Sequence, residues 1–121
     1  MDFTKKHCVP CEGGTQPLSK TKVVKYLKAV PGWQVVARYK QIEREYVFKD
    51  FVTTIKFINA LAKIAQAEGH HPNLSLFNWN HLKVQLSTHA IGGLSDNDFI
   101  LAARADLLLS RHPAWLKVLT K

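Results

Sequence analysis

Apolar residues in the first part of the chain follow a helical spacing and then form two strand-like runs. Ser19 can cap a short helix on which apolar side chains recur every three or four positions, and Pro31-Gly32 would end that helix. Residues 33–37 and 41–48 are rich in β-branched and aromatic side chains, which is typical of strands. We expect the two runs to pair as a hairpin around residues 38–40.

A longer helix follows, and both of its ends carry clear signals. Asp50 is a good N-cap residue, and Gly69 is the residue type that commonly ends a helix. Between them, apolar side chains at helical spacing form one apolar stripe, which consists of Phe51, Ile55, Ile58, Ala62 and Ala65.

The next segment predicts a second hairpin and a last helix. Apolar and polar residues alternate over 82–87, which indicates a strand with one buried face. Residues 74–76 belong to the strand before it, and residues 78–81 would hold the turn. Ser95 can then cap a helix that runs through Leu107.

The order strand, strand, helix therefore occurs twice. It predicts an α+β fold, in which a four-stranded antiparallel sheet has the helices packed on one face, with a short N-terminal helix in addition. We expect a single domain over residues 19–109, preceded by an irregular arm over 1–18 and followed by a tail over 110–121. A length of 121 residues agrees with one domain, since domains typically have ~100–200 residues.

The net charge of +8 suggests nucleic-acid binding, but its distribution along the chain argues against that role. Residues 1–40 carry 8 basic and 2 acidic side chains, and residues 104–121 carry 4 and 1. Residues 41–103 carry 5 basic and 6 acidic side chains. Because the excess lies at the two ends, and no basic stripe is interleaved with aromatic residues, we expect no nucleic-acid partner.

The sequence also argues against a membrane partner. No apolar run approaches the ~20 residues that a membrane span needs, and Met1–Lys6 leads into no apolar segment of signal-peptide length. We therefore expect a cytoplasmic protein whose two cysteines stay reduced.

Cys8 and Cys11 have the spacing of half a zinc knuckle or of a redox pair. A structural zinc site needs four ligands, and no second pair follows in the chain. The nearby prolines and glycines also oppose the strand and helix that flank a redox motif. The favoured interpretation is an N-terminal arm without a metal, and zinc shared across an oligomer comes second.

Three of the six histidines can be brought together by topology alone. His70 and His71 precede the third predicted strand, and His89 ends the fourth. If the hairpin turns near Asn80, residues equidistant from the turn face each other, so His71 should meet His89 at the open end. Pro72 favours an extended backbone at His71 and so holds the pair on a stiff segment.

Such a cluster is suited to proton transfer. An imidazole has an ordinary pKa of about 6.5, so proton-donating and proton-accepting forms coexist near neutral pH. Two rings that face one small molecule can remove one proton and deliver another, as an elimination of water or an isomerisation requires. Structural or surface histidines are a second interpretation, and a three-histidine metal site is a third.

Two other residues have alternative interpretations. Ser95 and Asp98 have the spacing of a capping box, so the carboxylate can simply satisfy the start of the last helix. Because that helix follows His89 by one glycine loop, the same carboxylate could instead orient an imidazole. The capping role is favoured, and Trp33 is taken from the pattern alone as a core side chain.

Taken together, these residues resemble the pterin-4a-carbinolamine dehydratases of the bacterial type. The similarity covers roughly residues 8–106 and depends on histidines, an aromatic residue and an aspartate at characteristic spacings, here His70-His71-Pro72, Trp79, His89 and Asp98. The resemblance implies loss of water from 4a-hydroxytetrahydropterin (4a-hydroxytetrahydrobiopterin) to give quinonoid dihydropterin. This reaction recycles the pterin after an aromatic amino acid hydroxylase has used it.

The resemblance also implies where the reaction takes place and what it needs. It implies no metal and no organic cofactor, and a homodimer or homotetramer. The catalytic residues carried over by position are His70, His71 and His89, and we take His70 as the base, His89 as the acid and His71 as mainly binding. The further substrate-binding positions are Gly69, Pro72, Ser87, Thr88, Asp98 and Trp33.

Two positions depart from the family pattern, and a second function stays open. Gln66 replaces a charged residue before the paired histidines, and Asn97 replaces a basic residue of animal members beside the aspartate. Both are expected to be peripheral. The alternative function is a non-catalytic one, either pterin binding without turnover or protein interaction, since animal members also act as dimerisation partners of a transcription factor.

Overall fold

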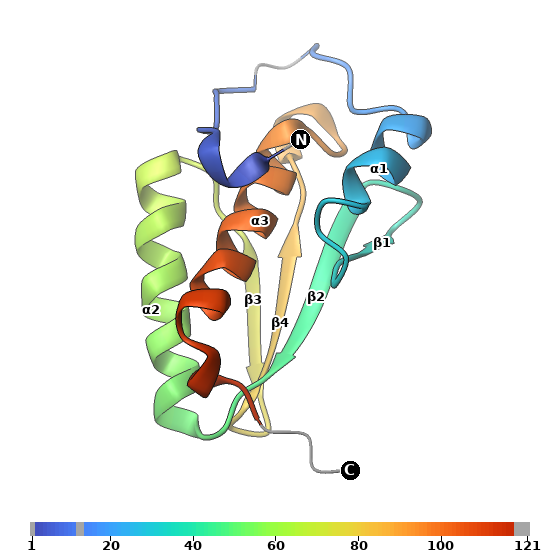
Figure 1. Ribbon diagram of the computed structural model, residues 1–121. Coiled ribbons are helices and arrows are strands. Elements are labelled where there is room, and N and C mark those ends of the chain that lie inside the picture. Colours follow the sequence, from blue (N-terminus) through green and yellow to red (C-terminus); the bar gives the residue numbers. More distant parts are fainter. Residues whose placement is uncertain (1, 12–13, 118–121) are drawn as a thin grey trace.

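The fold consists of three helices and four strands that follow one another as the sequence predicts (Figure 1). The computed structural model describes residues 2–11 and 14–117. Short 3₁₀ turns lie at Phe3–Lys5, His89–Ile91 and Pro113–Trp115. The main elements are α1 (Lys20–Leu27), β1 (Gln34–Val36), β2 (Gln41–Val47), α2 (Phe51–Glu68), β3 (Asn73–Phe77), β4 (His81–Leu86) and α3 (Asp96–Arg111).

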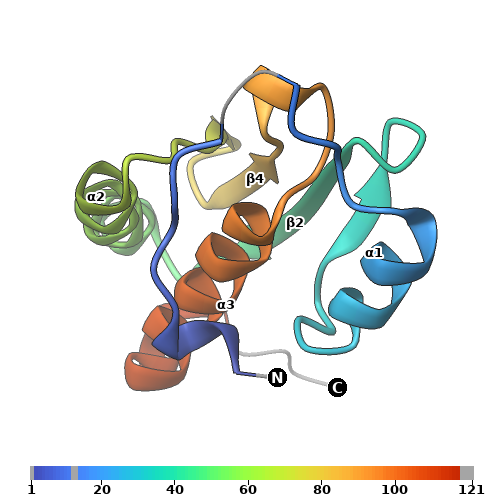
Figure 2. The same cartoon turned by 90° about the horizontal axis from the view of Figure 1, so that it is seen from above.

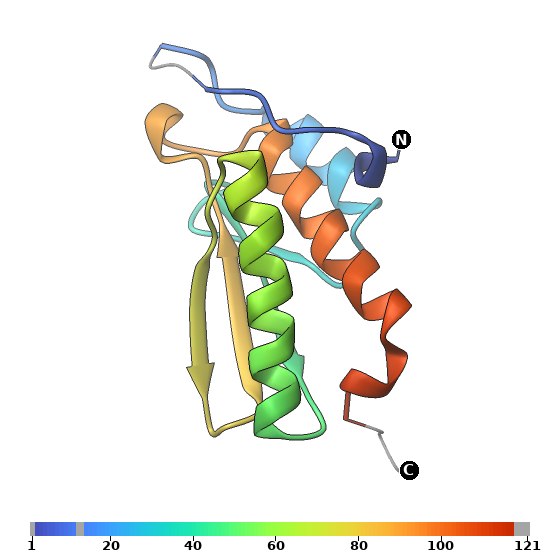
Figure 3. The same cartoon turned by 90° about the vertical axis from the view of Figure 1, so that its left-hand side faces the viewer.

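The four strands form one antiparallel sheet in the order β1-β2-β4-β3. Seen edge-on, the sheet has α2 and α3 on one face (Figure 3). Side chains on β2 and β4 alternate between that core and the open face, so Ile42, Leu82 and Val84 are buried. The predicted α+β architecture is confirmed, including the short helix α1 near the N-terminus.

The capping signals act as the sequence indicates. The Ser19 side chain accepts a hydrogen bond from the Lys22 N–H, and the Asp50 side chain accepts one from the Thr53 N–H. Gly69 adopts the left-handed conformation with φ 67° after the last turn of α2. This conformation carries little cost for glycine, and it turns the chain toward β3.

The apolar stripe predicted for α2 is buried only in part, at Ala65 and partly at Ile55 and Ile58. Phe51 and Ala62 are exposed, whereas the buried side chains of the helix are Thr53, Thr54, Phe57, Leu61 and Ala65. Apolar residues lie around most of this helix, so more than one stripe fits the same spacing. A polar residue can join the buried face because the Thr54 hydroxyl donates to the Asp50 carbonyl oxygen at 2.8 Å.

The β3–β4 hairpin turns one residue earlier than predicted. Phe77 pairs with His81, so the loop consists of residues 78–80 and is centred on Trp79. Asn78 and Trp79 both have positive φ values, 47° and 55°. Continued beyond the last pair, this register places His71 opposite Ser87 rather than opposite His89.

One polar cluster ties α3 to the strands on the β1 side of the sheet. The Asp106 carboxylate accepts hydrogen bonds from Trp33 Nε1 at 3.1 Å, from Arg44 Nη1 at 2.9 Å and from the Tyr46 hydroxyl at 2.8 Å. Burial raises the pKa of Tyr46 well above its ordinary value, and the nearby Asp106 carboxylate adds to this effect. The cluster supplies the partners that the buried Trp33 and Tyr46 need.

Described residues near both ends of the chain pack onto the body of the fold. Phe3 is buried in the core beside Tyr26 and Phe99, so the arm is anchored at its beginning. At the other end, Leu116 forms a bridge with Phe48. Over the part of the chain that the structure describes, no helix is both long and apolar enough to cross a membrane.

The Asp106 cluster predicts a stability effect. Asp106→Ala leaves the buried Tyr46 hydroxyl and Trp33 N–H without their acceptor, so it should lower the free energy of unfolding by about 2–4 kcal/mol. Urea denaturation at pH 7 measures this effect, and Asp106→Asn is the matched control because it keeps an acceptor oxygen. A loss below about 0.5 kcal/mol for Asp106→Ala would contradict the role given to the cluster.

Candidate functional site

A cleft lies at the end of the sheet where α2 ends, β3 begins and β4 ends. Its volume is ≈ 490 Å³, which is within the usual range for a small-molecule site. It brings together segments far apart in the sequence, namely the N-terminal arm, the end of α2, the segment after β4 and the start of α3. The lining residues are Val9, Pro10, Cys11, Glu68, Gly69, His70, His71, Ser87, Thr88, His89, Ala90 and Asn97.

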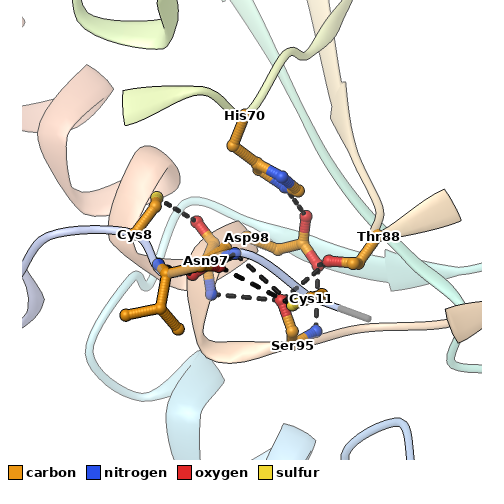
Figure 4. Close-up of polar contacts among 8 residues, drawn as sticks. Cys8, Cys11, His70, Thr88, Ser95, Asn97 and Asp98 are labelled. Atoms are coloured by element: carbon orange, nitrogen blue, oxygen red, sulfur yellow. Dashed lines mark hydrogen bonds and ion pairs between the residues drawn. The ribbon is translucent and has the colours of Figure 1, made fainter. Parts of the chain in front are cut away.

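His70 is held by a carboxylate beneath the cleft. Its Nε2 lies 2.6 Å from Asp98 Oδ1, and the Asp98 side chain is fully buried (Figure 4). Because a carboxylate only accepts, this contact assigns the proton to Nε2 and leaves Nδ1 of His70 as the accepting nitrogen of the neutral ring.

The other oxygen of Asp98 ties the loop after β4 to the start of α3. Its Oδ2 accepts from the Thr88 hydroxyl at 2.8 Å and from the Ser95 N–H at 3.0 Å. Ser95 completes a capping box at the start of α3. The two interpretations of Asp98 are thus both correct, since one oxygen caps the helix while the other meets His70.

The other two imidazoles are more exposed. His71 Nε2 lies 3.2 Å from Gln66 Oε1, one turn back on α2. His89 lies in the 3₁₀ turn after β4, and no hydrogen bond among the described residues involves its ring. All three histidines line the same cleft, although the hairpin register differs from the predicted one.

Most of the remaining predicted binding positions also gather here. Gly69, Ser87 and Thr88 line the cleft directly, while Pro72 is not among the lining residues. The structure does not bring Trp33 to the cleft. Its indole is buried in the core with Asp106 as its polar partner, because a carboxylate 73 residues later in the chain satisfies the ring N–H.

One wall of the cleft comes from the N-terminal arm, which the sequence did not indicate as part of the site. Val9, Pro10 and Cys11 line the cleft. Figure 2 shows the arm passing between α2 and α3 on its way to the loop after β4. The arm therefore forms part of the cleft.

Glu68 is the first of two anchors for the arm. Its carboxylate accepts from the Cys8 N–H at 2.6 Å, lies 2.9 Å from His7 Nδ1 and accepts from Arg104 Nη1 at 3.3 Å. The hydrogen bonds from His7 and Cys8 lower the pKa of Glu68. A sequence signal for this anchor existed, since an acidic residue in the last turn of a helix is unfavourable without a partner.

Asn97 is the second anchor, and it lines the cleft, although it was expected at the periphery of the site. The Val9 N–H donates to Asn97 Oδ1 at 3.0 Å, and Asn97 Nδ2 donates to the Val9 carbonyl oxygen at 2.6 Å. Asn97 Nδ2 also lies 3.5 Å from Cys11 Sγ (Figure 4). Gln66 in turn contacts His71, so both departures from the family pattern make contacts at the cleft.

The surroundings of Cys8 favour a structural role for this cysteine. Burial, together with the nearby carboxylates of Glu68 and Asp98, raises the pKa of Cys8 to about 12. A thiol with such a pKa is a poor nucleophile and a poor metal ligand at neutral pH. Among the residues that the structure describes, no three His, Cys, Asp or Glu side chains are placed to share a metal ion.

Comparisons with known proteins now decide the family. A family model described as Pterin 4 alpha carbinolamine dehydratase matches residues 16–108. The chain belongs to this dehydratase family. A protein of Nitrosospira multiformis named "Putative pterin-4-alpha-carbinolamine dehydratase" is 42% identical over 107 residues, which is 88% of this chain and 92% of the relative.

Two solved structures share the fold of this family member. A transcriptional coactivator/pterin dehydratase from Brucella melitensis matches with a TM-score of 0.71 and 32% identity, over 77% of this chain and 98% of that one. A pterin dehydratase-like protein described as a RuBisCO assembly factor in the alpha-carboxysome matches with a TM-score of 0.55 and 23% identity. That second match covers 64% of this chain and 88% of the other, and at this identity it shows the fold alone.

The Glu68 anchor predicts a pH dependence of stability. Because folding lowers the pKa of Glu68, its contribution is present above the ordinary value of 4.5 and is lost as the pH falls through the folded pKa. Glu68→Gln should therefore lower the melting temperature at pH 7, and the difference from wild type should shrink at pH 3. Glu45→Gln is the control, because its carboxylate is exposed and its ion pair among the described residues is with His81 at 3.3 Å. A difference that is constant from pH 7 to pH 3 would contradict the anchoring role.

Proposed function

We propose that the protein is a 4a-hydroxytetrahydrobiopterin dehydratase, which removes water from 4a-hydroxytetrahydropterin to give quinonoid dihydropterin. The observation that carries the proposal is the cleft, where three imidazoles surround one small-molecule site and one of them is held by a buried carboxylate. Membership of the dehydratase family supports the same reaction.

The reaction needs one proton removed and one delivered. A proton leaves a ring nitrogen of the substrate, the bond between C4a and the hydroxyl oxygen breaks, and the hydroxyl leaves as water after accepting a proton. Two histidines on one ligand can carry out both transfers and then exchange the proton with solvent. Neither a metal ion nor an organic cofactor takes part in the proposed sequence.

The hydrogen bonds around the cleft support a division of roles. Asp98 holds Nε2 of His70, so Nδ1 is free to accept the substrate proton, and the carboxylate stabilises the positive charge that develops on the ring. His89 lies in the cleft as an exposed ring, suited to deliver a proton to the leaving hydroxyl. His71, with Gln66 as its partner, would mainly bind the substrate.

A physiological setting follows from the proposed chemistry. The substrate is the 4a-hydroxylated pterin that an aromatic amino acid hydroxylase leaves to be recycled, so the partner reaction would be such a hydroxylation in the cytoplasm. A homodimer or homotetramer stays a prediction. The exposed edge strand β3, with Leu74 and Phe77 partly open to solvent, supports it, and sedimentation equilibrium would measure it.

The alternative is a protein without turnover that binds pterin or another protein. The relative from Brucella melitensis carries the name of a transcriptional coactivator as well as that of a pterin dehydratase. An interaction role of this kind would use outer surfaces and would not need the imidazoles of the cleft. The two functions therefore differ in how they respond to loss of the histidines.

The test is the decay of 4a-hydroxytetrahydropterin, followed in a stopped assay with wild type and the double variant His70→Ala, His71→Ala. General acid–base catalysis is commonly worth ~10²–10⁴-fold, so the double variant should lose at least about 100-fold of the acceleration. The matched control is His81→Ala, His112→Ala, which removes two rings outside the cleft. Equal rates for wild type and the cleft variant would contradict the enzyme proposal and favour the alternative.

A further inference from the structure

Residues 3–11 of the N-terminal arm reach the cleft held by contacts with the body of the fold. Near the start of the arm, Phe3 is buried in the core. At the end of the arm, the Leu18 N–H donates to the Leu94 carbonyl oxygen at 2.8 Å. Between these two points the Glu68 and Asn97 anchors hold consecutive residues of the arm, Cys8 and Val9. Val9 is therefore placed at the cleft by the surrounding structure before any ligand arrives.

Asn97 holds the backbone of Val9 through two hydrogen bonds. A primary amide has one acceptor and one donor end, and here both ends pair with the same residue, Val9, through its N–H and its carbonyl oxygen. Asn97 itself is only 4% exposed, so these bonds are shielded from water. The pairing resembles that between two strands, with a side chain in place of the second backbone.

Val9 is an exposed apolar side chain among the lining residues of the cleft. It is 65% exposed, although its backbone N–H and carbonyl oxygen are both held by Asn97. The cleft is also lined by imidazoles and hydroxyls, contributed by His70, His71, Ser87, Thr88 and His89. The arm thus adds the apolar residues Val9 and Pro10 to a cleft that also carries polar groups.

We propose that Val9, positioned by Asn97, is a specificity-determining residue that packs against a ring face of the bound pterin. The edges of a pterin carry nitrogen, oxygen and amino groups, so its two ring faces are its apolar surfaces. Polar side chains of the cleft meet the edges, and the arm covers a face. This inference rests on the proposed dehydratase function and extends it to the residues that select the pterin ring system.

The assignment to a ring face has a consequence for ligand selectivity. Every pterin presents the same ring face, whatever substituent it carries at C6. Val9 should therefore contribute equally to binding of a pterin with a long polar substituent and of one with a methyl group. A contact with the substituent itself would favour one ligand over the other.

Binding is measured by isothermal titration of 7,8-dihydrobiopterin and of 6-methyl-7,8-dihydropterin into the full-length chain. Val9→Ala removes two methyl groups from the contact. The Kd should therefore rise about three- to tenfold, and by the same factor for both ligands. Val24→Ala is the matched control, because Val24 is 49% exposed on α1 and does not line the cleft. In turnover, Val9→Ala should raise KM by the same factor and leave kcat within about twofold.

The role of Asn97 is tested by combining variants. Asn97→Ala should weaken binding about as much as Val9→Ala, and the double variant should be no weaker than the weaker single variant, because a released arm no longer presents Val9. Asn97→Asp, which keeps an acceptor for the Val9 N–H but loses the donor to the Val9 carbonyl, should show the same KM effect even if Asn97→Ala disturbs the start of α3.

Each outcome of these titrations has one meaning. If wild type binds neither pterin, the proposed function fails. If wild type binds and Val9→Ala matches Val24→Ala, the inference about the arm fails while the proposed function stands. An effect on one ligand alone would overturn the contact with the ring face, and additive effects of the two variants would overturn the positioning role of Asn97.

Discussion

The buried carboxylate of Asp98 is the interaction on which the rest of the site depends. A fully buried charge is tolerated only where its oxygens are hydrogen-bonded, and here both oxygens are occupied. Their partners come from three places: His70 after α2, Thr88 after β4 and Ser95 at the start of α3. Losing the geometry of the site would therefore leave a buried carboxylate unsatisfied, so folding and preorganisation of the site are coupled.

One part of the cleft is held by Asp98, and the N-terminal arm that forms another part is held by Glu68 and Asn97. Among the described residues that line it there is neither lysine nor arginine, and the carboxylate of Glu68 is occupied by the arm and by Arg104. The basic excess of the chain thus lies outside the cleft. A neutral ligand with polar edges and apolar faces suits such a surface better than an anion does, which agrees with the proposed pterin substrate.

Much of the fold could be predicted because its signals are local. Ser19, Asp50 and Gly69 act on neighbouring backbone groups, and the alternation on β4 records which face is buried. The gathering of the three histidines also followed from topology, and it survived an error of one residue in the position of the turn. Residues at the ends of adjacent strands stay close together after a shift of one residue, so the three rings still line one cleft.

The remaining features depend on contacts between distant residues. The place of Trp33 is decided by Asp106, and the place of the arm is decided by Glu68 and Asn97, about 60 to 90 residues away in the chain. A sequence gives no periodic signal for single polar pairs of this kind. Most of the buried face of α2 escaped prediction for another reason, because the exposed residues Phe51 and Ala62 fit the apolar spacing as well as the buried residues do.

We propose that Asp98 fixes the tautomer of His70 and that Nδ1 of this ring accepts the substrate proton. Two-bond nitrogen–proton NMR spectra of histidine-labelled protein, recorded at a pH where the rings are neutral, measure which nitrogen carries the proton. The account predicts that His70 is protonated at Nε2 in wild type and becomes a mixture of tautomers in Asp98→Asn. A wild-type ring protonated at Nδ1, or identical spectra for His70 in the two proteins, would contradict it.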